Sequence, residues 1–204
     1  MEEKPEHLSE DMAPFWGGYG FEFKLISAEL FNKHGPDLNS LRKHALNLGQ
    51  GKKFLIDISR HEYVDHRLSM EFDGYVIYVY SPEMIVCEKL RAICQQMSEY
   101  GPIVRRARSG GARARDFVDI YYLVTTLRLN ITAQESRGVI SEMFRMKKVP
   151  LALLGLVGEY REFHRADFAA VRATVRPSIE LEDFDFYFDF TLNLIRELKP
   201  LWHV

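Results

Sequence analysis

The pattern of apolar and polar residues changes its period once along this chain, close to residue 81. Before that point apolar residues alternate with polar ones, as in "FEFKLI" (21–26) and "KFLIDIS" (53–59). An alternation with a period of two predicts half-buried β-strands over both stretches. Asp73-Gly74 is a hairpin-type turn signal, and "YVIYVY" directly after it predicts a third strand.

One helix is predicted within this first part, over residues 36–48. It begins at Pro36-Asp37, and its apolar residues have helical spacing: Leu38, Leu41, Ala45 and Leu48. Residues 1–14 are polar, so we expect a loosely ordered N-terminal segment.

From Ser81 onward the spacing of apolar residues is that of helices. Ser81 can cap the start of a helix, and Pro82 is favoured at the first helical position. The negative charge of Glu83 is stabilising in the first turn, at the positive end of the helix dipole. A helix over residues 82–98 then buries one stripe, made of Val86, Leu90, Ile93 and Met97.

A second helix is predicted in the stretch "GARARDFVDIYYL" (111–123), after a loop from Tyr100 to Gly111. Its expected buried stripe consists of Phe117, Ile120, Tyr121 and Val124. Further helices fit residues 132–146, 150–164 and 183–198.

Strands followed by helices indicate an α+β fold. Three short strands with one helix make a thin sheet, and sheets usually need more strands to bury their faces, so the chain reads as if it begins part-way through a domain. We therefore expect a flexible N-terminus (1–14), a partial α/β lobe (15–80) and a helical lobe (81–204).

Composition narrows the class of protein. The 204 residues are 47% hydrophobic with a formal net charge of −2, which fits a globular protein and argues against a coat of nucleic acid over its whole surface. Cys87 and Cys94 lie about 10.5 Å apart along one helix, too far for a disulfide. We read both as buried hydrophobes of a reduced, cytoplasmic protein. The start "MEEKPEHLSEDM" is no signal peptide, and the apolar run 151–157 is too short to cross a membrane.

Lys89 is the first candidate for chemistry. It lies in the middle of the first predicted helix, between apolar residues. Such a lysine can extend its ammonium to solvent, which gives it no special role. The other interpretation is a phosphate-binding lysine that points into a cleft.

Asp116 and Asp119 are three residues apart and are neighbours on one side of the second helix. Arg115 and Asp119 could form an ordinary surface ion pair of little energetic value. Because the aspartates adjoin the buried aromatic stripe, a polar edge of an active site is the alternative.

The loop before this helix is rich in arginine, with no acidic residue among them: Arg105, Arg106, Arg108, Arg113 and Arg115. The loop is either simply solvated or contacts phosphates of a nucleotide or nucleic acid, and the second case predicts strongly salt-dependent binding.

Asp57 lies in the second strand, on the face opposite Phe54, Ile56 and Ile58. Alternation places it in water. A carboxylate there can also ligate Mg²⁺ at the edge of a cleft, together with substrate phosphates.

Taken together, "SPEMIVCEKLRAI" (81–93) and "ARARDFVDIYYL" (112–123) resemble the paired signature of the AbiEii/AbiGii-type nucleotidyltransferase toxin family. The stretches "FWGGYGFEFKLI" (15–26) and "FLIDISRHE" (54–62) are similar to its sheet region. The resemblance covers the chain from about Phe15 to the C-terminus.

This resemblance implies a polymerase-β-like nucleotidyltransferase lobe followed by a helical lobe. It implies transfer of a nucleoside monophosphate from an NTP, with Mg²⁺, to an acceptor such as tRNA, in a toxin–antitoxin or phage-defence system with a cognate antitoxin. By motif position, Lys89 would hold the triphosphate, Asp116 would be the functional aspartate with Asp119 beside it, and Asp57 would be the strand carboxylate near the metals. Arg105, Arg106, Arg113 and Arg115 would contact the acceptor or the triphosphate.

The sequence departs from the family at its first motif, a glycine pair followed by a serine and an Asp-x-Asp on a strand. No Asp-x-Asp follows Gly17-Gly18, and "DFDFYFDF" (183–190) lies in the last predicted helix. In the family this motif would precede residue 1. Two hypotheses follow. The chain is a truncated or divergent nucleotidyltransferase, or it is a non-catalytic remnant that binds RNA, nucleotide or, through its sheet edge, a partner protein.

Overall fold

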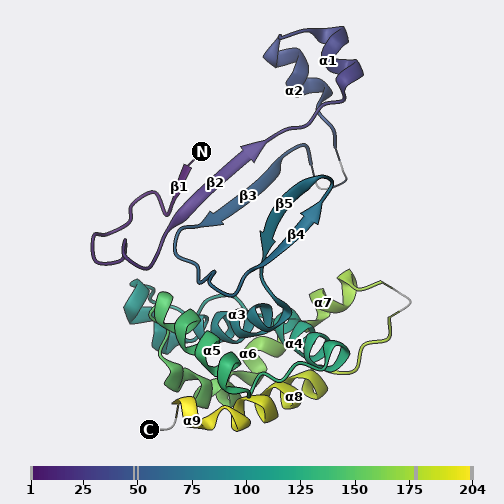
Figure 1. The fold of residues 1–204 in the computed structure, drawn as a ribbon. Helices are drawn as coiled ribbons and strands as arrows, with labels where there is room; N and C mark the ends of the chain where they lie inside the picture. Colours follow the sequence, from purple (N-terminus) through teal and green to yellow (C-terminus); the bar gives the residue numbers. More distant parts are fainter. Residues whose placement is uncertain (1, 48, 50, 177–178, 203–204) are drawn as a thin grey trace. The chain divides into compact units, whose positions relative to one another are not determined.

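The structure is a computed structural model that describes residues 2–47, 49, 51–176 and 179–202, and it divides into two compact units, Met1–His61 and Glu62–Val204 (Figure 1). The predicted lobes met after residue 80, whereas the second unit here also includes the hairpin before that residue. The α+β class is confirmed, with small antiparallel sheets in the first part of the chain and helices in the second.

The first unit contains a three-stranded antiparallel sheet in the order β1 (Glu2–Lys4), β2 (Gly18–Phe23) and β3 (Phe54–Ser59). Strands β2 and β3 were predicted, and Phe21 pairs with Ile56 in their register. A Cβ atom on Gly18 would lie 2.2 Å from the carbonyl oxygen of Ile58, so glycine is needed for this close pairing. Strand β1 falls where the polar composition had predicted a loosely ordered segment.

Two short helices, α1 (Ala28–His34) and α2 (Leu38–His44), lie between β2 and β3. The predicted helix over 36–48 is therefore confirmed in its central part, and the Asp37 carboxylate caps it by accepting two backbone N–H groups. Ala45 is buried as predicted, but Leu38 is exposed, and Leu48 lies outside the described residues. Helix α1 was not predicted.

The second unit begins with a hairpin of β4 (Leu68–Phe72) and β5 (Tyr75–Val79). Asp73 and Gly74 both have positive φ, of 52° and 80°, as the predicted two-residue turn requires. Strand β5 was predicted and β4 was not, because "LSMEF" alone gives a weak alternation.

The prediction of a half-buried strand is wrong for β3, and β5, which was predicted only as a strand, is exposed as well. Leu55 and Ile56 point to opposite faces of β3 and are 66% and 49% exposed, and Tyr75 and Val76 of β5 are exposed in the same way. The alternation correctly predicted an extended backbone, but it could not predict whether a second layer covers either face.

The rest of the second unit is helical. Its α-helices are α3 (Pro82–Gln95), α4 (Ala114–Leu127), α5 (Gln134–Met146), α6 (Arg161–Arg165), α7 (Phe168–Thr174), α8 (Phe184–Glu197) and α9 (Lys199–Trp202). Two segments are 3₁₀-helices, η1 (Ser98–Val104) and η2 (Leu151–Tyr160). The predicted helix over 150–164 is therefore η2 followed by α6, and the short helices α7 and α9 were not predicted.

Helix α3 packs between α4 and α5, and α4 packs in turn on α8 (Figure 1). Ser81 caps α3 as predicted, since its Oγ accepts the N–H of Met84 at 3.2 Å. The predicted stripe of α3 is buried, and so are Phe117 and Ile120 of α4. Phe117 stacks on Phe188 with ring centroids 4.9 Å apart. This packing places the polar edge of α4 directly beside α3.

Cys87 and Cys94 are buried free thiols on α3, as predicted, and burial raises the pKa of Cys87 to about 12. In the part of the chain that the structure describes, no helix combines the length and hydropathy that a membrane crossing needs.

Candidate functional site

Lys89 of α3 lies between the two aspartates of α4. Its Nζ donates to Oδ1 of Asp116 at 2.9 Å and to Oδ2 of Asp119 at 2.7 Å. The side chain of Lys89 is only 19% exposed, so the interpretation of a lysine that extends into solvent is wrong. The surface pair between Arg115 and Asp119 is wrong as well, because Arg115 instead donates to Thr174.

The charges of this cluster stabilise each other. Burial by itself lowers the pKa of Lys89. The hydrogen bond that Lys89 donates to Asp119, together with the charge of Asp116 and the hydrogen bond donated to it, outweighs this effect, so the pKa lies above its usual value. Lys89 is therefore an ammonium at neutral pH. Asp116 is the most buried member, with a side chain 6% exposed, whereas Asp119 is 35% exposed.

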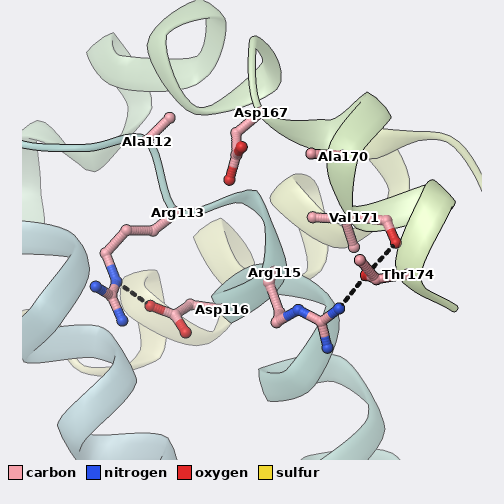
Figure 2. Close-up of a pocket in the computed structure, with 8 residues that line it drawn as sticks. All are labelled: Ala112, Arg113, Arg115, Asp116, Asp167, Ala170, Val171 and Thr174. Carbon is pink, nitrogen blue, oxygen red and sulfur yellow. Dashed lines mark hydrogen bonds and ion pairs between the residues drawn. The ribbon is translucent and has the colours of Figure 1, made fainter. Parts of the chain in front are cut away.

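Asp116 uses both of its oxygens. Oδ1 accepts from Lys89, and Oδ2 accepts from Nε of Arg113, the residue that precedes α4 (Figure 2). The Arg113 side chain is 39% exposed, and its two terminal nitrogens have no hydrogen-bond partner among the described residues. Arg113 can therefore hold Asp116 with Nε and still offer N–H donors to an anion.

A pocket of about 320 Å³ opens next to this ion pair, between the start of α4 and α7 (Figure 2). Arg115 crosses one side of it and donates a hydrogen bond to Oγ1 of Thr174 on α7. Asp167 lies on another side of the same pocket (Figure 2). The lining mixes both charges with small apolar groups, and comprises Ala112, Arg113, Arg115, Asp116, Asp167, Ala170, Val171 and Thr174.

His164 of α6 is the functional candidate that sequence reasoning missed. Its side chain is fully buried, and its Nδ1 accepts the backbone N–H of Arg113 at 3.1 Å. Burial lowers the pKa of His164 to about 4, with a smaller upward effect of Asp116 and a downward effect of Arg113. A single histidine in "EFHRAD" has no partner at a characteristic spacing, so the sequence carried no signal for this contact.

The loop arginines lie in different surroundings. The guanidinium of Arg106 donates to the carbonyls of Gln95 at 2.9 Å and Met97 at 3.2 Å, which fixes the loop to the end of α3. Arg105 is exposed and has a positive φ of 54° at the end of η1. Only Arg113 and Arg115 line the pocket beside Asp116.

Asp57 lies on an exposed position of β3 in the first unit, as the alternation predicted. Within the described ranges, no group of three or more histidine, cysteine, aspartate or glutamate residues could hold a metal ion. A metal-ligating role of Asp57 stays a prediction.

Comparison with known proteins matches the chain to a protein family. The model of a protein family described as "Nucleotidyl transferase AbiEii toxin, Type IV TA system" matches residues 13–190, which is most of the chain. No curated protein and no solved structure is significantly similar to this chain.

Proposed function

Because the chain belongs to the AbiEii nucleotidyl transferase toxin family, we propose that it transfers a nucleoside monophosphate from an NTP to an acceptor such as tRNA. The observation that carries this proposal is the cluster of Lys89, Asp116 and Asp119 on the adjoining helices α3 and α4. It joins a partly buried cation, a carboxylate held between two cations, and a second carboxylate open to solvent.

In this proposal Lys89 binds the triphosphate. An ammonium has three N–H donors, and the two aspartates use two of them. The third is available to a phosphate oxygen. A lysine held in place by two carboxylates is already oriented, so binding costs little side-chain entropy, and its charge offsets the charge that develops on the leaving pyrophosphate.

Asp119 contacts the acceptor. Its Oδ1 has no hydrogen-bond partner among the described residues, and the side chain is exposed enough to be reached. Such an oxygen can accept the hydrogen bond of an attacking hydroxyl and orient it. Arg113 and Arg115, beside the pocket, contact phosphates of the acceptor or of the NTP, with Arg105 at the loop end. Arg106 has a structural role through its hydrogen bonds to α3.

Mg²⁺ enters this proposal as part of the Mg–NTP substrate. The described residues do not form a complete metal site: Asp57 is one carboxylate, and the Asp116–Asp119 pair already holds the ammonium of Lys89. Mg²⁺ commonly binds through one or two protein carboxylates together with phosphates, and Asp57 is the carboxylate that the sequence predicts for it.

The family description names a type IV toxin–antitoxin system. The proposal therefore includes a cognate antitoxin as partner, a role in phage defence and a cytoplasmic site of action. It excludes attachment to a membrane.

Transfer of label tests the activity. The purified chain is incubated with Mg²⁺, bulk tRNA and each α-labelled NTP in turn. We expect label to enter RNA with the wild-type chain, and to be lost in Lys89→Ala and reduced in Asp119→Asn. The exposed Lys33 of α1 provides the matched control, and Lys33→Ala should transfer as well as wild type.

The Asp119→Asn variant guards against misinterpreting a folding defect, because a partly exposed carboxylate can be neutralised at little cost in stability. Transfer that survives in both variants would remove this cluster from the reaction. No transfer by the wild-type chain, with salt-sensitive binding of RNA or NTP retained, would instead favour the binding remnant.

A further inference from the structure

The start of α4 has no conventional cap. The residue at the N-cap position is Arg113, which makes no side-chain capping hydrogen bond, although it precedes a helix of 14 residues. The residue three positions later is Asp116. An acidic residue at that position commonly reaches back and accepts the N–H of the N-cap residue, as the second half of a capping box.

Asp116 does not make this contact, because His164 makes it instead. The N–H of Arg113 donates to Nδ1 of the imidazole at 3.1 Å, and both oxygens of Asp116 turn to cations, Lys89 on one side and the guanidinium of Arg113 on the other. A residue from α6 thus satisfies the backbone group that would otherwise compete for the carboxylate.

Packing alone does not account for an imidazole here. His164 is fully buried next to Phe117, with ring centroids 5.1 Å apart, and close to the ring of Phe163. Since Nδ1 accepts a hydrogen bond, the proton of the neutral ring lies on Nε2, which has no hydrogen-bond partner among the described residues. A buried N–H without an acceptor is unfavourable, so an apolar side chain would suit the surroundings better. An apolar side chain could not accept the hydrogen bond that Nδ1 accepts from the N–H of Arg113.

We propose that His164 is a positioning residue that directs the Asp116 carboxylate toward Lys89 by occupying the N–H of Arg113. This inference rests on the proposed function, in which the Lys89–Asp116–Asp119 cluster is the reacting site. His164 does not touch the substrate. It acts through Arg113 and Asp116, and without it Asp116 turns back to the start of its own helix and Lys89 loses one of its two partners.

Two variants of His164 distinguish a positioning role from a packing role. In His164→Asn the amide oxygen can replace Nδ1 as acceptor, although the ring is lost and the core is less well filled. In His164→Leu the apolar surroundings are well filled, but no acceptor remains. A purely structural role predicts that the leucine variant behaves more like wild type. A positioning role predicts the opposite order.

Nuclear magnetic resonance of the full chain tests the inference without any enzymatic assay. In wild type we expect Nδ1 of His164 to show the shift of an unprotonated ring nitrogen and a scalar coupling across the hydrogen bond to the Arg113 amide. The pKa of the Lys89 ammonium should stay above its usual value in His164→Asn and should decrease in His164→Leu. A protonated Nδ1, or an unchanged Lys89 in the leucine variant, would overturn the proposal.

Kinetics provide the second readout. His164→Leu is expected to lower kcat/KM for the NTP by about tenfold or more, because Asp116 no longer holds Lys89 in the orientation that binds the triphosphate. His164→Asn should recover most of that loss. Equal rates in the two variants would contradict positioning. If wild type transfers no label, the proposed function fails, and the resonance measurements still decide the role of His164.

Discussion

A Lys89→Met variant is expected to unfold with a free energy about 3–5 kcal/mol lower than wild type at neutral pH. The ammonium of Lys89 neutralises Asp116, whose side chain is only 6% exposed, and Asp119 lies on its other side. Methionine has a similar volume and keeps the apolar contacts of α3, so the loss reports the charge. Urea unfolding followed by far-ultraviolet circular dichroism measures it.

Neutralising the Asp116 carboxylate in the same variant should restore most of the lost free energy of unfolding. In Lys89→Met the buried Asp116 carboxylate keeps only Arg113 as a cationic partner among the described residues. The double variant Lys89→Met/Asp116→Asn removes that buried charge, and its amide oxygen can still accept from Arg113. An exposed ion pair contributes up to about 1 kcal/mol. If the free energy of unfolding of Lys89→Met lies within about 1 kcal/mol of the wild-type value, the cluster is solvated like a surface ion pair.

Acid should destabilise the helical unit through His164. Burial lowers its pKa to about 4 in the folded protein, from 6.5 for a free side chain. Above pH 6.5 the ring is neutral in both states, and its contribution is complete. As the pH falls toward 4, the unfolded chain binds a proton that the folded chain does not, so the free energy of unfolding decreases by about 2–3 kcal/mol from this group.

The control for this effect is His164→Asn, which removes the titrating ring and retains an acceptor. Urea unfolding of both proteins at pH 7 and at about pH 4.5, within the window of these two pKa values, gives the comparison. We expect wild type to lose more stability than the variant, because the carboxylates of the chain affect the two proteins about equally. Parallel losses in the two proteins would mean that the folded state accommodates a charged His164.

The helices that the sequence predicted correctly share a long apolar stripe and a clear start. Helix α3 has both, with Ser81 as its cap and four apolar residues on one face, and the structure confirms it. The segments that were missed are short, such as β1, β4, α1 and α7, and a few residues cannot display a period. Residues 150–164 have helical hydropathy, but the structure contains a 3₁₀ segment there, because hydropathy does not encode the hydrogen-bond register.

The candidate site was predicted in its residue types and not in its contacts. The sequence placed Asp116 and Asp119 on one side of a helix and Lys89 on another helix. Two other arrangements were also compatible with that spacing: a lysine in solvent and an Arg115–Asp119 pair. Only the packing of α3 against α4 decided between them, because it brings the three side chains within hydrogen-bond distance of one another.

The local sequence therefore determined the helix that carries each functional side chain, since amphipathic spacing and capping residues act within a few residues of the chain. The tertiary structure alone decided which of those side chains touch. It separated Arg113 and Arg115, which line a pocket, from Arg106, which holds the backbone of α3. It also brought His164 to the first turn of α4, a contact over 51 residues of sequence that depends on how α6 packs rather than on any pattern along the chain.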